Sequence, residues 1–157
     1  MRNSWLAVLA VVPAVALMGA CGGDNDDGGE AVSPEKQEFI EKTNAACDKV
    51  YERTDKITSD FFDANPEPTP AEAAKFMARI APLARDSVND IKRYDGPKED
   101  QAELNRIGAA ADDGVAEVEK AAKDEELASA ILGGGKDPFS RAKTLAKDYG
   151  LDICGRA

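Results

Sequence analysis

The stretch from residue 33 to residue 62 decides the fold, and it reads SPEKQEFIEKTNAACDKVYERTDKITSDFF. It opens on Ser33, a preferred N-cap residue, and on Pro34, which fits the first helical position because no hydrogen bond is lost there. Apolar or half-polar side chains then recur at steps of three and four residues: Phe39, Ile40, Cys47, Val50, Tyr51, Thr54, Ile57, Phe61 and Phe62. Prolines follow within residues 66–70 and stop a helix. We therefore expect one long amphipathic helix over residues 34–64.

Three further stretches show the same helical period. They cover residues 70–95, 97–122 and 138–149, and each is bounded by proline or glycine. Residues 125–132 form a short helical piece that the glycines of 133–135 interrupt. Because no stretch shows sustained alternation with β-branched residues, we expect no sheet. The sequence predicts an all-α fold, an antiparallel up-down four-helix bundle with a broken last helix, over residues 34–157.

The sequence ahead of this bundle has the features of an export signal. Arg2 precedes an uncharged run over residues 5–20, and residues 17–21 read LMGAC. This stretch resembles a bacterial lipobox, whose cysteine takes a diacylglycerol before cleavage makes it the new N-terminus. We expect residues 1–20 to be a removed lipoprotein signal peptide, Cys21 to be lipidated, and residues 21–33 to be a flexible acidic, glycine-rich tether. A plain signal peptide with a stray cysteine is the alternative.

The other two cysteines lie in the first helix and in the last residues of the predicted bundle's sequence. Cys47 is on the apolar face of the first helix, and Cys154 follows the last one. In an up-down four-helix bundle the first helix starts where the fourth ends, so residues 151–153 can fold back and bring the sulfur atoms together. Export exposes the chain to oxidation, so we expect a Cys47–Cys154 disulfide. Two free thiols or a redox pair are the alternative, although no C-x-x-C spacing is present.

The composition excludes several classes of function. The chain has 30 acidic and 20 basic residues and no histidine, which gives a formal net charge of −10. The acidic excess argues against a nucleic-acid partner, since such binding depends on Lys and Arg that neutralise phosphates. The lack of histidine excludes Ser-His and Cys-His nucleophiles and every His-ligated metal site. We expect no cofactor.

The lipobox, the tether and two terminal motifs together resemble a known kind of protein. The motifs are Asn44-Ala45-Ala46-Cys47 in the first helix and Tyr149-Gly150-Leu151, followed by Cys154-Gly155, near the end of the chain. They resemble small Cys-anchored secreted lipoproteins of high-GC Gram-positive, actinobacterial type. The resemblance implies a membrane anchor and a helical domain whose two end cysteines pair, and it supplies no catalytic residues.

Three motifs suggest chemistry, but each lacks a required part. Ser140 and Lys143 form an S-x-x-K pattern, yet the S-D-N and K-T-G elements of penicillin-recognising enzymes are missing. Residues 133–136, GGGK, lack the first glycine and the Ser or Thr of a phosphate-binding loop. Residues 24–35 have EF-hand spacing with Gly28 at the fifth position, where a calcium ligand belongs. We interpret the three as a helix start, a helix break and a solvated acidic linker.

Asn44 is the polar residue of the first helix with the strongest claim to a ligand. It shares the apolar face with Ile40, Cys47 and Tyr51, so we expect it to be half buried. Two interpretations stay open. Asn44 is a core-edge amide bonded to a neighbouring backbone group or hydroxyl, or it contacts a ligand near the disulfide end of the bundle.

Three classes of function remain. The sequence favours a non-catalytic, membrane-anchored lipoprotein that binds a protein or polymer of the cell envelope. A carrier of lipid or a small molecule in a cleft between helices is the alternative, although an aromatic content of 6% disfavours a roomy pocket. A cell-wall hydrolase or acyl-transfer enzyme is the third. The lipid anchor on Cys21 predicts a place on the outer face of the cytoplasmic membrane.

The lipobox yields the first testable prediction. Protein extracted from membranes with detergent should carry acyl chains on Cys21, and Cys21→Ala should leave an uncleaved precursor, because lipidation precedes cleavage at this kind of site. Intact mass measurement of both proteins checks this. A mature form that starts at Cys21 and carries no lipid mass contradicts it.

Overall fold

The helices of the computed structural model, which describes residues 32–156, follow the predicted stretches closely. They are α1 (Pro34–Ala64), α2 (Pro70–Ile91), the 3-10 turn η1 (Lys98–Asp100), α3 (Gln101–Ala121), α4 (Glu125–Leu132) and α5 (Ser140–Tyr149). No strand occurs within residues 32–156, so the all-α class is confirmed. The signal peptide, Cys21 and nearly all of the tether lie outside the described residues.

Local capping explains where the helices begin. The Ser33 hydroxyl accepts a hydrogen bond from the Lys36 backbone N–H at 3.2 Å. Thr69 and Glu72 form a capping box, in which each side chain binds the backbone N–H of the other residue. Asp124 caps α4 by accepting from the Leu127 N–H at 3.0 Å. Each cap provides a partner for a backbone donor that the first helical turn leaves unpaired.

Three helix boundaries differ from the prediction. The third helix begins at Gln101, after the 3-10 turn η1, rather than at residue 97. The second helix ends at Ile91 rather than near residue 95, because Tyr94 N–H bonds to the Ile91 carbonyl in a turn. The last helix begins at Ser140, since Asp137 and Pro138 form a turn in which the Asp137 carboxylate accepts from the Phe139 N–H at 2.9 Å. The glycine break after residue 132 is present, and it separates α4 from α5.

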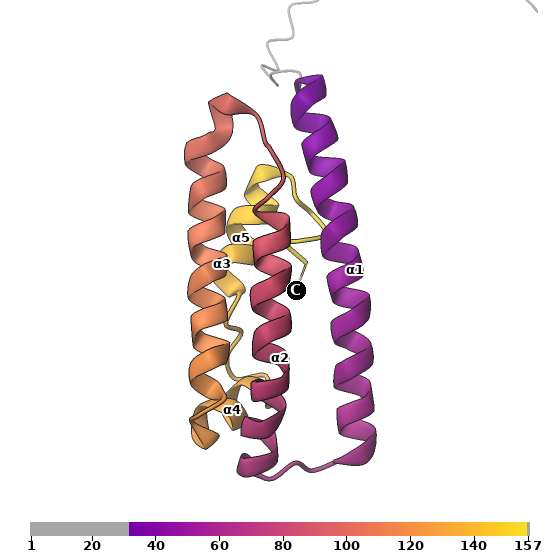
Figure 1. Cartoon of the computed structure of the whole chain (residues 1–157), viewed down its shortest axis with the longest axis vertical. Helices are drawn as coiled ribbons and strands as arrows, with labels where there is room; N and C mark the ends of the chain where they lie inside the picture. Colours follow the sequence, from indigo (N-terminus) through magenta and orange to yellow (C-terminus); the bar gives the residue numbers. More distant parts are fainter. Residues whose placement is uncertain (1–31, 157) are drawn as a thin grey trace, which may run out of the picture. The chain divides into compact units, whose positions relative to one another are not determined.

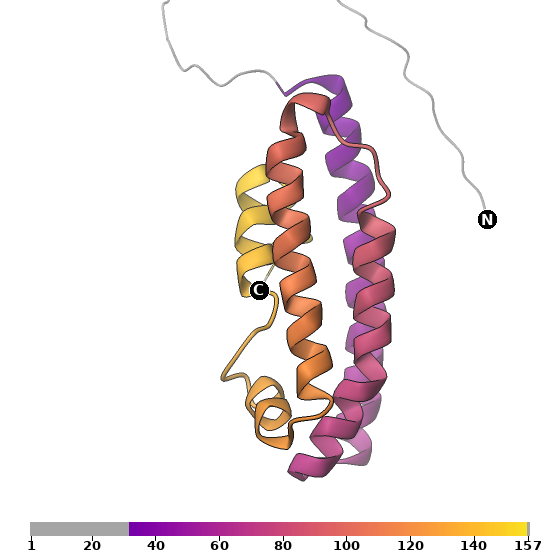
Figure 2. The same cartoon turned by 60° about the vertical axis from the view of Figure 1, so that its left-hand side comes forward.

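The helices are packed unevenly. Figures 1 and 2 show α1, α2 and α3 side by side, with α4 near the end of α3 and α5 running along α3. α2 and α3 share the most extensive contact. α1 approaches α2, whereas no Cα atom of α1 lies within 8 Å of a Cα atom of α3, α4 or α5. The long first helix therefore stands away from most of the domain.

An apolar cluster lies at each end of the domain and holds the helices together there. The first cluster joins the end of α1 to α2, α3 and α4, and its buried members are Phe61, Ala73, Ala74, Phe76, Met77, Ala81, Val118, Ala121 and Ala128. The second cluster joins the start of α1 to α5 and the residues after it, and its buried members are Phe39, Ala146, Tyr149 and Leu151. Phe61 stacks on Phe76 with ring centroids 4.3 Å apart. These clusters, the ion pairs and the disulfide described below all lie within one compact unit, residues 32–156, which therefore contains its own stabilising contacts.

A polar cluster closes the end that contains the second apolar cluster. The Tyr149 hydroxyl donates to the Asp100 carboxylate at 2.8 Å, and Lys36 Nζ lies 3.1 Å from the same oxygen atom. Lys36 Nζ also lies 4.2 Å from the centroid of the Tyr149 ring, a cation–π contact. The hydrogen bond from Tyr149, followed by the contact with Lys36, lowers the pKa of Asp100 although burial opposes this change. Three separate elements, α1, η1 and α5, are thus linked through one carboxylate.

This cluster gives a pH-dependent prediction. Because its pKa is lowered in the folded state, Asp100 stabilises the fold above its ordinary pKa, and that stabilisation is lost as the pH falls through the folded-state value. Tyr149→Phe removes the main donor and should reduce the free energy of unfolding at neutral pH by about 1–3 kcal/mol. The difference between wild type and variant should shrink below a pH of about 4.

Urea denaturation at several pH values measures both effects. Tyr94→Phe, which removes a hydroxyl outside this cluster, is the matched control. A Tyr149→Phe difference that stays constant down to the acid transition contradicts the assignment to Asp100.

Candidate functional site

A cavity of about 600 Å³ lies between α1 on one side and α2, α3 and α5 on the other. Along α1 its lining begins at Phe39, in the second apolar cluster, and ends at Thr54, just before the first cluster. Along α2 it begins at Leu83, just after the last buried residue of the first cluster, and continues to the end of the helix. The domain is thus packed at both ends and hollow in the middle.

The walls of the cavity are mainly aliphatic. The apolar lining includes Val50, Leu83, Ala84, Val88, Ile91, Leu104, Ile107, Ala111, Ala142 and Leu151. Leu83, Val88 and Ile107 are only partly buried, although they are apolar. Protein interiors contain few voids larger than a water molecule. A space of this size falls in the range of about 300–1,000 Å³ that is typical of ligand pockets.

The C-terminal residues 150–156 keep α1 in its place. A disulfide joins Cys47 to Cys154 with a Cα–Cα distance of 5.2 Å, as the sequence predicted. Asn44 accepts a hydrogen bond from the Ile153 backbone N–H at 3.0 Å, and the Tyr51 hydroxyl donates to the Cys154 carbonyl at 3.1 Å. Residues 150–156 therefore connect α1 to α5 across the distance that separates the two helices.

Glycine allows this segment to turn back from the end of α5. Gly150 has φ of 100°, a left-handed conformation, and the following Leu151 N–H bonds to the Ala146 carbonyl. This is the helix-ending motif that favours glycine. At Gly155 a Cβ atom would lie 2.6 Å from the Lys147 Cβ, so the close approach of the segment to α5 requires glycine. The terminal motif found in the sequence thus has a structural reason at each of its glycines.

The structure gives Asn44 a partner within the protein. Its side-chain oxygen is bonded to Ile153, and Asn44 is not among the residues that line the cavity. The bond is of the kind expected for a core-edge amide. A ligand contact at Asn44 stays a prediction, while the cavity supplies a different set of candidate contacts.

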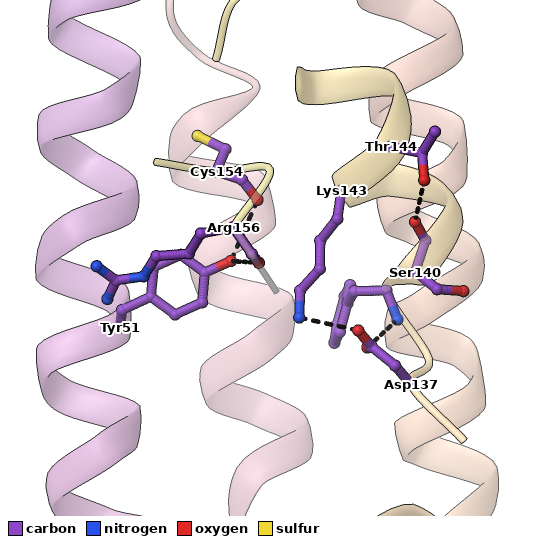
Figure 3. A network of polar contacts seen from close by, with 8 residues as sticks. Tyr51, Asp137, Ser140, Lys143, Thr144, Cys154 and Arg156 are labelled. Carbon is purple, nitrogen blue, oxygen red and sulfur yellow. Dashed lines mark hydrogen bonds and ion pairs between the residues drawn. The ribbon is translucent and has the colours of Figure 1, made fainter. Parts of the chain in front are cut away.

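Each lysine that lines the cavity has a carboxylate partner, and only Asp112 of the two partners lines the cavity itself. Lys143 Nζ lies 2.8 Å from the Asp137 carboxylate, and Lys92 Nζ lies 2.6 Å from that of Asp112. Figure 3 shows Lys143 extending from α5 toward Asp137, while Ser140 lies exposed one turn away. The structure thus gives Lys143 the carboxylate of Asp137 as its partner, whereas the S-x-x-K pattern suggested one with Ser140.

Tyr51 lies at the same wall. Its hydroxyl donates to the backbone carbonyls of Cys154 and Arg156, and the Arg156 guanidinium lies 4.1 Å from its ring centroid (Figure 3). Burial raises the pKa of Tyr51, although the charges of Lys143 and Arg156 oppose the change. The phenol donates both of its hydrogen bonds to the C-terminal segment and helps to hold it in place.

Thr43 differs from the other polar groups of the cavity. It is 1% exposed and lines the cavity, and its hydroxyl has no hydrogen-bond partner among residues 32–156. Cys154 Sγ lies 3.7 Å from the Thr43 carbonyl oxygen, which places Thr43 beside the disulfide. An unpaired buried hydroxyl is destabilising, so Thr43 is a conspicuous exception in this wall.

The cavity is roomy although aromatic residues make up only 6% of the chain, contrary to the expectation from composition. The cavity needs few aromatic residues because its walls are aliphatic and because α1 stands off from α3 and α5. One signal was available in the sequence. Several small residues of α2 and α3 line the cavity, and they include Ala84, Ser87, Gly108 and Ala111.

Comparison with known proteins does not add a relative. The chain matches no family model, no curated protein and no solved structure. In the part of the chain that the structure describes, no group of three or more His, Cys, Asp or Glu side chains is placed to hold a metal ion. None of the described helices has the length and apolar character needed to cross a membrane.

The disulfide gives a prediction about stability. Cys154→Ser should lower the melting temperature by roughly 5–20 °C, because the loss of a native disulfide from a domain of this size removes about 2–5 kcal/mol. The circular dichroism spectrum at low temperature should barely change, since the apolar clusters remain. Thermal melting of residues 22–157 measures the effect.

The reciprocal variant is the control for this experiment. Cys47→Ser should lower the melting temperature by the same amount, and the double variant should lower it no further, since both changes remove one bond. Two titratable thiols in protein isolated without reductant contradict the bond itself.

Proposed function

We propose that this chain is a lipid-anchored, non-catalytic binding protein that holds an apolar small molecule or a lipid chain in its central cavity. The observation that carries this proposal is the aliphatic cavity of about 600 Å³ between two well-packed ends. The sequence favoured a module that binds a protein or polymer partner. The cavity now favours the carrier, because a pocket of this volume has no use in an adaptor that binds through its outer surface.

The chemistry of the walls supports a flexible, aliphatic occupant. Leucine, valine and isoleucine offer dispersion contacts without directional bonds, so they suit an acyl or isoprenoid chain. The lysine side chains that line the cavity are neutralised by Asp112 and Asp137. The site therefore offers an ionic head group little free charge, and we propose that the bound part of the ligand is neutral.

The anchor is part of this proposal. The LMGAC stretch at residues 17–21 supports lipidation of Cys21 and a place on the outer face of the cytoplasmic membrane, as in the actinobacterial lipoproteins that the sequence resembles. An anchored carrier stays near a source of lipid, which suits a site built for apolar chains. Nothing in the composition favours nucleic acid as a partner.

We also propose that α4 and α5 together serve as the fourth member of an up-down bundle. α4 packs on α2 and α3, and α5 packs on α3, so the pair covers the face that one long helix would cover. The break between α4 and α5 allows the two helices to take different positions. It lets α4 close one end while α5 borders the cavity, which its residues Ala142 and Ala146 line.

A non-catalytic role agrees with the polar groups at the site. Tyr51 and Lys143 are each bonded to protein groups, and the Ser140 side chain lies exposed on the surface. A general base or nucleophile needs a partner aimed at a reacting atom. The bonds of Tyr51 and Lys143 instead hold the segments that line the cavity in place.

The test uses residues 22–157 and N-phenyl-1-naphthylamine, a neutral dye whose fluorescence rises in apolar surroundings. Wild type should bind the dye saturably. Ala111→Leu, which adds bulk to a lining position of α3, should weaken binding by about tenfold or more, because extra methyl groups displace the dye. Ala116→Leu is the matched control, since Ala116 is exposed on the same helix and does not line the cavity.

Two outcomes contradict the carrier. One is the absence of saturable dye binding by wild type, and the other is equal binding by wild type and Ala111→Leu. Native mass spectrometry of full-length protein from its own membranes provides a second readout, in which a non-covalent lipid adduct is expected. A stable co-purifying protein without such an adduct favours the adaptor instead.

A further inference from the structure

The middle of α1 carries its charges in two separate stripes. Within residues 39–59 the basic stripe is Lys42, Lys49, Arg53 and Lys56, and the acidic stripe is Glu41, Asp48, Glu52 and Asp55. Because successive residues of a helix are about 100° apart around its axis, each stripe covers an arc of about 60°, and the centres of the two arcs are about 100° apart. Neither arc contains a charge of the opposite sign in this part of the helix.

The two stripes lie on opposite sides of the apolar face. The acidic stripe lies toward the C-terminal segment, since the Asp48 carboxylate is 3.4 Å from the Arg156 guanidinium. The basic stripe lies toward α2, since Lys42 Nζ is 4.6 Å from the ring centroid of Tyr94, which follows the end of α2. Tyr94 lines the cavity. The basic stripe therefore runs along the α2 side of α1, next to the wall of the cavity.

The charges of the basic stripe are available to a partner. All four side chains are exposed, and Lys49 and Arg53 form no ion pair within residues 32–156. Lys56 is paired with Asp60 at 3.3 Å, but both side chains are largely exposed, and such a pair is weak in water. The chain has a net charge of −10, yet acidic groups beyond about 8 Å are screened at physiological ionic strength. A surface close to the stripe thus experiences a local positive charge.

The form of the basic stripe fits a flat anionic surface. Lys42 and Lys56 are about 21 Å apart along one straight helix, so anionic groups in a single plane can meet all four side chains. A protein interface is usually centred on buried apolar or aromatic residues. The uncharged residues nearest to the stripe between Lys42 and Lys56 are only Ala45 and Ala46. Attraction of basic side chains to lipid phosphates needs no such apolar centre.

We propose that the basic stripe of α1 docks the domain onto the anionic lipid headgroups of the membrane surface. Docking would turn the α2 side of α1, next to the cavity, toward the bilayer. α1 is the first helix after the proposed tether, so an anchor on Cys21 would keep the stripe within reach of the headgroups. The inference goes beyond the proposed function, because it concerns an outer surface and does not depend on what the cavity holds.

The experiment measures how residues 22–157 sediment with lipid vesicles. Vesicles of phosphatidylglycerol and phosphatidylcholine in equal parts should bind more protein than vesicles of phosphatidylcholine alone, and added salt should reduce the difference. The double variant Lys49→Gln, Arg53→Gln should lower the partition coefficient for the mixed vesicles by about tenfold or more. Each basic group near an anionic membrane contributes a factor of about five to binding.

The double variant Lys120→Gln, Lys123→Gln is the matched control. It removes the same two charges from exposed positions at and just after the end of α3, so it should keep vesicle binding. Circular dichroism shows that both variants are folded. Equal partition of wild type into the two kinds of vesicle, or an equal loss in the two double variants, overturns the docking surface.

Dye binding by the same proteins separates this inference from the carrier. None of the four substituted residues lines the central cavity, so every variant should bind N-phenyl-1-naphthylamine as wild type does. Wild type that binds the dye but does not prefer the mixed vesicles overturns the docking surface alone. Wild type that prefers the mixed vesicles but binds no dye supports the docking surface and overturns the proposed function.

Discussion

The attachment of α1 to the C-terminal segment is the constraint on which the rest of the structure depends. Between the two apolar clusters, α1 has no close backbone contact with α3 or α5. The disulfide from Cys47 and the hydrogen bonds of Asn44 and Tyr51 connect it to residues 153–156 instead. This segment acts as a spacer as well as a link. It keeps α1 at a distance that leaves the cavity between the helices, and it prevents α1 from moving further away.

The hollow middle has an energetic consequence for the two ends. Partly exposed lining residues such as Leu83 and Val88 contribute less burial than core residues do. The ends compensate with close packing, since alanines at positions such as 73, 121 and 128 are almost fully buried and let the helices approach. The covalent bond adds stabilisation that does not require a filled core. In the chain-entropy model, closing a loop of this length contributes about 4–5 kcal/mol.

The fold was more predictable from the sequence than the site was. The helix starts at Ser33 and Thr69 depend on local capping chemistry, which is readable in the sequence. The Cys47–Cys154 disulfide could be predicted from the positions of the two cysteines in an up-down bundle. The cavity depends on the distance between α1 and its neighbours, which no local pattern encodes. The bond between Tyr149 and Asp100 joins residues 49 positions apart, and Thr43 is notable only because other residues leave its hydroxyl unpaired. Such features arise from the assembled helices rather than from any one of them.

The disulfide also determines how the domain would respond to a pulling force. It closes a covalent loop between positions that are 107 residues apart, and this loop contains α2, α3, α4 and α5 entirely. A force applied between residue 33 and residue 156 would pass through the first three to four turns of α1, cross the sulfur–sulfur bond, and leave through the final residues. The helices inside the loop would carry almost none of it. Such a force could thus stretch the start of α1, while the part of the cavity wall inside the covalent loop kept its arrangement.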